Sequence, residues 1–260
     1  MSFINISYVR PKKYLGQHFL TDENIARKIV ESFSEKCTTN DILEIGPGMG
    51  VLTKYLLDEK KFQTWAIDID KESVEFLKNK FTVFGNRLIE DDFLRMDLTN
   101  YFKDEFSLIG NFPYNISSQI LFKMIDNRKQ IPLMVGMFQK EVAERLQAKT
   151  RTKDYGILSV ITQAFYTVEY LFTVNEDVFN PPPKVKSAIV RLIRKDNVLD
   201  CDETLFRRVV KTAFNQRRKK LRNAISSFGI SDENLKNFVG KRAEELSVDE
   251  FVELTNIIAK

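Results

Sequence analysis

The sequence predicts an α/β protein in which an open, mostly parallel sheet precedes a small all-helical domain. From Asp41 to about Arg194, short apolar segments alternate with amphipathic ones, which is the pattern of buried strands separated by helices. A glycine-rich turn follows the first apolar segment, where open α/β sheets bind their ligands. From about Asp202 onward only helical patterns remain. We therefore expect two domains, at residues 1–198 and 199–260.

Seven segments carry the strand pattern, and several of the earlier ones are apolar throughout, as strands covered on both faces are. In chain order they are Ile42–Ile45, Thr64–Ile69, Arg87–Glu90, Phe106–Ile109, Leu133–Phe138, Val168–Val174 and Ser187–Ile193. Helical patterns lie between them at Val51–Leu57, Ser73–Phe81 and Ser117–Met124. This alternation favours helices on both faces of the sheet.

Helices are also predicted on either side of the sheet region. Asp22 can cap a helix whose Ile25, Ile29 and Phe33 fall on one face. The C-terminal region has helical signals at Leu205–Phe214, at Lys219–Phe228, in a short piece after Ser231, and at Asp249–Ala259.

Composition argues against several classes of protein. The chain has 260 residues, of which 43% are hydrophobic and 29% charged, as in an ordinary soluble protein. Cys37 and Cys201 form no CxxC pair, so neither a metal site nor a disulfide framework is expected, and a reducing, cytoplasmic setting is the default. Met1–Lys13 lacks the apolar run of a signal peptide, and no stretch approaches the roughly 18 apolar residues of a membrane span. His18 is the only histidine, which argues against histidine-based catalytic triads. We expect the protein to be a monomer.

The net charge of +4 is unevenly distributed. Residues 207–222 contain eight basic side chains and no acidic one, whereas residues 223–260 contain four basic and seven acidic residues. A concentrated positive patch is what a polyanion partner requires, and the alternative is a solvated helix face. The predicted contacts to a polyanion in this run are Arg207, Arg208, Arg217, Arg218, Lys219, Lys220 and Arg222.

The glycine-rich turn has the sequence Glu44-Ile45-Gly46-Pro47-Gly48-Met49-Gly50. Glycines allow a sharp turn and the close approach of a ligand, although a tight turn without a ligand would look the same. The spacing differs from the GxGxxG of dinucleotide sites, and acidic Glu44 suits a ligand that carries an ammonium and a sulfonium. S-adenosylmethionine is such a ligand and is the predicted cofactor, held at Gly46 and Gly48.

Carboxylates follow the next two predicted strands. Asp68 ends the second strand, where an acid can accept hydrogen bonds from both ribose hydroxyls. Asp70 is the local rival but is better placed to cap the next helix. After the third strand, Asp92 is the candidate acceptor for the adenine amine of the cofactor, with Phe93 against the ring. The alternative is that these are solvated loop acids.

The segment Asn111-Phe112-Pro113-Tyr114 follows the fourth apolar strand and is the most specific motif in the chain. An exocyclic adenine amine is a poor nucleophile because its lone pair is delocalised, so an acceptor for each of its hydrogens would favour the reactive pyramidal form. Asn111 Oδ1 and the Phe112 carbonyl can supply the two acceptors, and Pro113 stiffens the turn. Tyr114 offers a face for base stacking, worth roughly 1–3 kcal/mol, and in-line alignment would contribute roughly 7–11 kcal/mol. An ordinary Asn-Pro loop is the alternative.

A second aromatic face is expected from Phe179, which precedes three consecutive prolines. The prolines would hold the loop rigid, and Lys184 and Lys186 would face phosphates. Plain core packing of Phe179 is the alternative.

Taken together, these motifs resemble the ribosomal RNA adenine dimethyltransferase family, in particular its bacterial members that modify small-subunit rRNA. The matching segments, in order, are Arg10–Leu20, Glu44–Gly50, Asn111–Tyr114, Phe179–Ser187 and Asn215–Arg222. The resemblance implies a class I S-adenosylmethionine-dependent methyltransferase, with a Rossmann-like seven-stranded sheet whose last strand is antiparallel.

The resemblance also implies contacts and a reaction. The implied cofactor contacts are His18, Leu20, Gly46, Asp68, Asp92 and Asn111. Lys12 and Lys13 would lie on phosphates. Family members often have Asn in place of His18 and Glu in place of Asp68, and the shorter Asp68 reaches less far towards the ribose. The implied products are two adjacent N6,N6-dimethyladenines in the hairpin loop near the 3′ end of 16S rRNA, made in the maturing small ribosomal subunit.

Three rival functions remain open at this point. An erythromycin-resistance methyltransferase would perform the same chemistry on 23S rRNA, but the triple proline and Asn215–Arg222 favour the small-subunit enzyme. A DNA adenine methyltransferase usually has an acidic residue at the position of Asn111. A non-catalytic ribosome assembly factor would not need an intact Asn111–Tyr114.

Overall fold

The computed structural model describes residues 8–260, which divide into two compact units. The first unit contains residues 8–143 and Glu169–Arg194, and the second contains Glu144–Val168 and Lys195–Lys260. The chain enters the second unit for the last time at Lys195, which lies close to the predicted domain boundary between residues 198 and 199. The prediction of two contiguous domains did not foresee that residues 144–168 belong to the second unit. They do so because α6 (Ile157–Phe165) packs against the C-terminal helices α7 (Glu203–Asn215) and α10 (Val248–Ile258).

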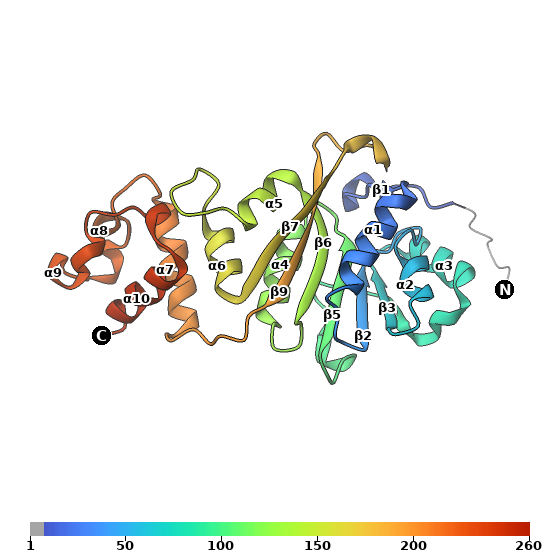
Figure 1. The fold of residues 1–260 in the computed structure, drawn as a ribbon, viewed down its shortest axis with the longest axis horizontal. Coiled ribbons are helices and arrows are strands. Elements are labelled where there is room, and N and C mark those ends of the chain that lie inside the picture. The colour runs from blue at the N-terminus through green and yellow to red at the C-terminus, as the bar shows by residue number, and fades with distance from the viewer. Residues whose placement is uncertain (1–7) are drawn as a thin grey trace. The chain divides into compact units, whose positions relative to one another are not determined.

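A seven-stranded sheet is the core of the fold (Figure 1). Its strands are β2 (Asp41–Ile45), β3 (Gln63–Asp68), β4 (Leu88–Glu90), β5 (Phe106–Asn111), β6 (Leu133–Gln139), β7 (Tyr166–Val174) and β9 (Ser187–Arg194). They lie in the order β4-β3-β2-β5-β6-β9-β7. Strands β2 to β6 pair in parallel, and β9 runs antiparallel to β6. All seven predicted strands are therefore present, and the antiparallel last strand is confirmed.

Helices connect the strands and make up most of the second unit. Those not yet given are α1 (Glu23–Ser34), α2 (Thr53–Asp58), α3 (Lys71–Lys80), α4 (Ser117–Asp126), α5 (Lys140–Leu146), α8 (Leu221–Ala224) and α9 (Asp232–Leu235). The sequence analysis did not predict α6, because most of its residues are apolar or β-branched and its few polar residues do not mark one side of a helix as solvent-facing. The single helix predicted at Lys219–Phe228 is wrong, because Ile225 leaves the helical region (φ −111°, ψ 17°) and a 3₁₀ turn at Ser226–Phe228 follows α8.

The central strands of the sheet are buried on both faces. Ile42, Ile109 and Val135 belong to one apolar cluster with α1 and α2. Side chains alternate along a strand, so Leu43 and Leu108 point to the opposite face, where they are also fully buried. This double burial is the reason that most residues of the central strands are apolar.

A separate two-stranded sheet joins the N-terminal segment to the proline-rich loop. It pairs β1 (Phe19–Leu20) antiparallel with β8 (Phe179–Asn180), with Leu20 opposite Phe179. Directly after β1, Asp22 accepts hydrogen bonds from Asn24 N at 2.8 Å and from Ile25 N at 3.0 Å, which confirms it as the cap of α1. Strands of two residues have no periodicity, so the sequence did not predict this sheet.

From residue 8 onward, no helix is long and apolar enough to cross a membrane. The same part of the chain brings no three His, Cys, Asp or Glu side chains together in an arrangement that could hold a metal ion.

Candidate active site

The glycine-rich turn leaves β2 and reaches the end of the neighbouring strand. Gly46 N donates a hydrogen bond to Ile67 O at 2.9 Å. Gly48 has a φ of +54°, and a Cβ at this position would lie 2.7 Å from Phe19 Cε1. Any other residue would be both strained and in collision. The turn therefore presents bare backbone to the pocket described next.

A pocket opens at the carboxyl edge of the parallel strands, within the first unit. The predicted cofactor residues that line it are His18, Gly46, Gly48, Asp68, Asp92 and Asn111. A smaller pocket, which shares Gly46 and Asn111 with the first, is also lined by Leu20 and Glu44. The structure thus brings all eight predicted cofactor residues to one place.

Glu44 is the most deeply buried acid of this site. It is 1% exposed, and its Oε2 accepts a hydrogen bond from Thr53 Oγ1 at 2.6 Å. Burial, with a smaller effect from the Asp68 carboxylate, raises the pKa of Glu44 to about 8. The carboxyl group is therefore largely protonated at neutral pH, and a cation placed beside it would favour the ionised form.

Asp68 stands at the end of β3 with both oxygens on backbone donors. Oδ2 accepts from Gly48 N at 3.3 Å and Oδ1 from Asp70 N at 2.9 Å. Burial raises the pKa of Asp68 to about 6. A carboxylate has about four lone-pair positions, so two remain for the ribose hydroxyls that the sequence assigned to it.

Apolar side chains and Asp92 form the opposite part of the pocket. Ile69 lines the pocket and is 56% exposed. Phe93 and Leu94 also line the pocket. Asp92 Oδ1 accepts from Leu94 N at 2.9 Å, and Oδ2 lies 3.4 Å from Arg95 Nε. An apolar wall with a carboxylate at its margin suits a flat base with a polar edge.

The orientation of Asn111 is fixed by the N-terminal segment. Asn111 Nδ2 donates to His18 O at 2.9 Å. Because a carbonyl oxygen can only accept, the amide nitrogen must face His18, and Oδ1 remains available as an acceptor. The side chain therefore has the orientation that the predicted amine-acceptor role requires.

The ring of Phe112 fills a socket formed by two glycines. Phe112 is 1% exposed. A Cβ on Gly110 would lie 2.7 Å from Phe112 Cε1, and a Cβ on Gly136 of β6 would overlap the ring. Phe138 closes the socket edge-to-face, with ring centroids 5.4 Å apart. The buried ring anchors the backbone whose carbonyl is the second predicted acceptor.

Gly136 was not among the predicted site residues. A lone glycine within an apolar strand is the signal that could have identified it, because such a glycine marks the close approach of another group. We expect Gly136→Ala to displace Phe112 and to lower kcat roughly tenfold, since a shift of about 1 Å misaligns the acceptor. Overpacking should also lower the free energy of unfolding by about 1–3 kcal/mol.

Steady-state kinetics and thermal unfolding would measure the two effects of Gly136→Ala. Gly240→Ala is the matched control, because a Cβ at Gly240 would meet no atom within 4 Å. A normal kcat in Gly136→Ala would contradict the anchoring role of the socket.

Tyr114 stacks on His18 rather than standing free. Their ring centroids are 5.4 Å apart with an interplanar angle of 24°. The Tyr114 hydroxyl is hydrogen-bonded to Ser187 Oγ. His18 Nδ1 lies 2.7 Å from Pro181 O, so Nδ1 carries the hydrogen and donates it. A base that stacks on Tyr114 must use its other face or displace the His18 ring.

Phe179 is packed in the core of the first unit. It is 4% exposed and belongs to the same apolar cluster as Leu20 and α1. It is not among the residues that line the pocket. Base stacking by Phe179 would require its ring to turn out of this cluster, and that role stays a prediction.

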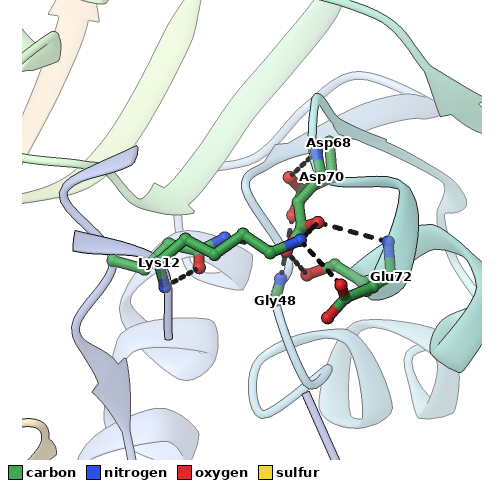
Figure 2. A network of polar contacts seen from close by, with 7 residues as sticks. Lys12, Gly48, Asp68, Asp70 and Glu72 are labelled. Carbon is green, nitrogen blue, oxygen red and sulfur yellow. Dashed lines mark hydrogen bonds and ion pairs between the residues drawn. The ribbon is translucent and has the colours of Figure 1, made fainter. Parts of the chain in front are cut away.

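A polar network around Asp70 holds the N-terminal segment against the sheet (Figure 2). Lys12 Nζ pairs with the Asp70 carboxylate and lies 3.3 Å from Glu72 Oε1. Gln17 Nε2 donates to Asp70 Oδ2 at 3.3 Å. Although burial opposes the shift, these hydrogen bonds lower the pKa of Asp70. Asp70 also accepts from Glu72 N at 3.2 Å, which confirms its predicted role as the cap of α3.

Lys12 was predicted to lie on a phosphate, but here two carboxylates match its charge. We expect Lys12→Met to loosen the pocket wall at residues 15–19 and to weaken cofactor binding about fivefold, the equivalent of roughly 1 kcal/mol. kcat at saturating cofactor should be unchanged. Titration with S-adenosylhomocysteine at low and high salt would measure the effect.

Lys13→Met is the control for this experiment, because exposed Lys13 makes no ion pair within residues 8–260. A dissociation constant equal to that of the wild type in Lys12→Met would mean that the segment is held without Lys12.

The predicted RNA contacts divide into exposed and engaged side chains. Exposed ones are Lys13, Lys184 and Lys186 in the first unit and Arg208, Arg218, Lys219, Lys220 and Arg222 in the second, although Arg222 Nη1 also lies 3.4 Å from Asp232 Oδ2. Arg207 is half-buried, and Arg217 is held by Glu244 and by backbone carbonyls. The basic run is not one helix, because α7 ends at Asn215 and α8 begins at Leu221.

The topology and the pocket define the class of protein. A sheet with β9 inserted antiparallel, a glycine turn after β2 and a carboxylate at the end of β3 are the features of a class I S-adenosylmethionine-dependent methyltransferase. The residues fit that cofactor: Gly46 and Gly48 bring backbone without side chains to the pocket, Glu44 and Asp68 supply acids, and Ile69 supplies an apolar face. Comparison with known proteins takes the assignment further. The model of the family described as ribosomal RNA adenine dimethylase matches residues 9–260, and the chain belongs to this family.

Individual relatives agree with the family assignment. The chain is 54% identical over 253 residues to "Ribosomal RNA small subunit methyltransferase A" of Cytophaga hutchinsonii, covering 96% of this chain and 98% of the relative. It is 53% identical over 253 residues to the protein of the same name from Flavobacterium johnsoniae, covering 96% of each. The chain is thus an S-adenosylmethionine-dependent rRNA adenine dimethyltransferase.

Solved structures are similar over almost the whole chain. A dimethyladenosine transferase from Plasmodium falciparum has a TM-score of 0.78 at 28% identity, covering 91% of this chain and 96% of that one. The 23S rRNA methyltransferase ErmE has a TM-score of 0.70 at 25% identity, covering 93% and 100%.

Proposed function

We propose that this protein methylates N6 of two adjacent adenines in the 3′-terminal hairpin loop of 16S rRNA, giving N6,N6-dimethyladenine in the maturing small ribosomal subunit. We propose further that it acts as a cytoplasmic monomer. The observation that carries the proposal is the hydrogen bond from Asn111 Nδ2 to His18 O, at 2.9 Å. It leaves Asn111 Oδ1 as an acceptor in the cofactor pocket, which is what methylation of an amine requires.

The chain's own residues would prepare the amine for reaction. Asn111 Oδ1 and the Phe112 carbonyl each accept one N6 hydrogen, which draws the nitrogen towards a pyramidal geometry with its lone pair available. Tyr114 supports the base, and the socket around Phe112 keeps the second acceptor in place. When bound, S-adenosylmethionine supplies an electrophilic methyl group. Alignment of the amine with that group would provide roughly 7–11 kcal/mol of the acceleration.

No strong base is needed in this scheme. The nitrogen becomes cationic as it is methylated, and a cationic amine loses its proton readily to water. For a second transfer the amine must turn so that its remaining hydrogen meets one acceptor. This fits a site in which the only imidazole, His18, is held on Pro181 O and stacked on Tyr114.

The cofactor would be held by the residues that line the two pockets. Glu44 is proposed to face the cationic amino acid part, Asp68 the ribose and Asp92 the adenine amine. His18, Leu20, Gly46 and Gly48 would complete the contacts. Their shared position at the carboxyl edge of the sheet supports this assignment.

The small-subunit substrate is favoured over 23S rRNA by the relatives. Those of about half identity are named as small-subunit enzymes, whereas the 23S enzyme ErmE is 25% identical. The test is mass spectrometry of rRNA nucleosides after incubation with labelled S-adenosylmethionine. Undermethylated small subunits should yield labelled N6,N6-dimethyladenine, and large subunits should yield none. Label found only on 23S rRNA, or on neither, would rule out the proposal.

A further inference from the structure

The loop between α5 and α6, residues 147–156, is held in an unfavourable conformation. Arg151 has a φ of +68°, and within residues 8–260 it is the only residue other than glycine with a positive φ. A residue with a Cβ adopts this region only when its surroundings impose it, and such residues collect at functional sites. The loop lies in the second unit, away from the methylation pocket in sequence, and no part of it was predicted as a site.

Arg217 holds the two residues that follow Arg151. Its Nη1 donates to Lys153 O at 2.6 Å and its Nη2 to Thr152 O at 2.8 Å. Its Nε donates to Glu244 Oε2 at 2.6 Å. The backbone of Glu244 completes the arrangement, because Arg151 N donates to Glu244 O at 2.7 Å. All three guanidinium nitrogens of Arg217 are therefore used within the unit, so Arg217 is an internal support rather than a free cation.

The supported loop presents a row of positive charges. Lys149, Arg151 and Lys153 are all exposed. The nearest carboxylate to the Arg151 guanidinium is Glu245 Oε1 at 3.8 Å, and the Arg151 side chain remains 73% exposed. Lys149 and Lys153 make no ion pair in the described part of the chain. These side chains alternate with threonines, so the charges are spaced along the loop rather than clustered at one point.

The same support connects the loop to the basic run. Arg218 and Lys219 follow Arg217 directly, and both are exposed with no ion pair among the described residues. The Arg217 side chain donates hydrogen bonds to the backbone carbonyl groups of Thr152 and Lys153. Arg218 and Lys219 are the next two residues of the chain. Two segments about 65 residues apart in sequence are thus hydrogen-bonded to each other.

We infer that Lys149, Arg151 and Lys153 form, with Arg218 and Lys219, one preorganised phosphate-binding surface for duplex rRNA. The inference rests on the proposed function for the identity of the RNA. A row of exposed lysine and arginine side chains on a loop whose backbone is held in place fits a phosphate backbone, whose charges have fixed spacing, and such contacts position an RNA without reading its sequence. Holding the loop before binding lowers the ordering cost at the moment of contact.

The inference is tested by the salt dependence of RNA binding to the full-length protein. The probe is deproteinised, undermethylated 16S rRNA, and the affinity is measured between about 50 and 200 mM salt. The triple variant Lys149→Gln, Arg151→Gln, Lys153→Gln should flatten the slope of log K against log salt by about 2 and weaken binding at low salt at least tenfold. The control Lys60→Gln, Lys78→Gln, Lys103→Gln removes the same charge from exposed sites of the first unit and should leave the slope nearly unchanged. Equal slopes in the two triple variants would overturn the inference.

A second pair of variants tests the supporting role of Arg217. Arg217→Lys keeps the charge but cannot hold two carbonyls and a carboxylate, so it should weaken RNA binding severalfold. Arg194→Lys is the matched control. Arg194 likewise holds two carbonyls, Arg128 O and Lys129 O at 2.9 Å, and a carboxylate, Glu105 Oε1 at 2.7 Å, but in the first unit. Unchanged affinity in Arg217→Lys would show that the charge alone matters.

Three readouts keep the outcomes distinct. Binding of S-adenosylhomocysteine should be normal in every variant, which establishes that the first unit is folded. Methylation of small subunits by the wild-type protein tests the proposed function separately from this surface. If the loop variant loses affinity for intact subunits but not for deproteinised rRNA, the loop binds a ribosomal protein and the inference is wrong.

Discussion

Asn111→Ala should lower kcat roughly 100- to 1,000-fold, the range found when one preorganised hydrogen-bonding group is removed from a reacting centre. The variant loses the Oδ1 acceptor, so only the Phe112 carbonyl remains to hold an N6 hydrogen. It also loses the donor that meets His18 O, and we expect cofactor affinity to fall about fivefold, for one hydrogen bond of roughly 1 kcal/mol. Single-turnover methylation at saturating cofactor, with a separate binding titration, would measure the two losses.

Asn111→Asp separates the two functions of this side chain. An aspartate keeps an acceptor oxygen but cannot donate to His18 O when it is ionised, and its charge would oppose that carbonyl. Cofactor affinity should therefore fall at least as far as in Asn111→Ala, while single-turnover activity at saturation should be higher than in Asn111→Ala. If both variants retain wild-type kcat, the amide is not the acceptor of the amine.

The sheet was predictable because its strands are buried on both faces. Burial of that kind favours apolar residues at most positions, and a run such as Phe106–Ile109, in which Ser107 is the one polar residue, has few other interpretations. The order of the strands around the glycine turn then placed Glu44, Asp68 and Asn111 at one edge, where the pocket is found.

Contacts between segments distant in sequence were not predictable. The hydrogen bond that orients Asn111 comes from a residue 93 positions earlier, and the ion pair of Lys12 with Asp70 joins residues 58 apart. Neither has a periodic signature, since each depends on how the N-terminal segment crosses the sheet. The sequence could therefore name His18 as a neighbour of the cofactor by resemblance, but not as the group that orients Asn111.

The number of basic residues in the second unit likewise does not show which of their side chains are free. Arg217 and Arg218 are adjacent and chemically identical, and the sequence assigned both to RNA. The folded chain gives Arg217 a carboxylate and two backbone carbonyls, while Arg218 is exposed. Which of two neighbouring arginines is free depends on the backbone that lies opposite, and that backbone comes from another part of the chain.

The second large effect expected is a steep pH dependence of cofactor binding that originates in Glu44. Without a ligand, burial raises the pKa of Glu44 to about 8, so the carboxyl group is mostly neutral at pH 7. A cationic ligand lowers that pKa, and binding then releases a proton. Affinity for S-adenosylmethionine should therefore rise by up to tenfold for each pH unit from about pH 6 until it levels off near pH 8. Asp68, with a pKa of about 6, contributes mainly below this window.

Glu44→Gln should remove this slope, because glutamine cannot ionise. Its affinity should approach that of the wild type near pH 6 and fall about 10- to 100-fold behind it at pH 8. Calorimetry in two buffers of different ionisation enthalpy would count the proton released by the wild type and find none in the variant. If Glu44→Gln keeps the wild-type slope, the titrating group lies elsewhere.

Stability without ligand should change in the opposite direction. The pKa of Glu44 is raised on folding, from an ordinary value near 4.5 to about 8, so its contribution is fully favourable below the unfolded value and is lost as the pH rises through 8. Glu44→Gln keeps an acceptor for Thr53 Oγ1 but has no proton to lose. The variant should therefore unfold at a higher temperature than the wild type at about pH 8.5, and the difference should close towards pH 5. Ionisation of Glu44 thus lowers the stability of the ligand-free protein and raises its affinity for the cofactor over the same pH range. The negative charge of Glu44 is therefore favourable only when the cation of the cofactor is bound.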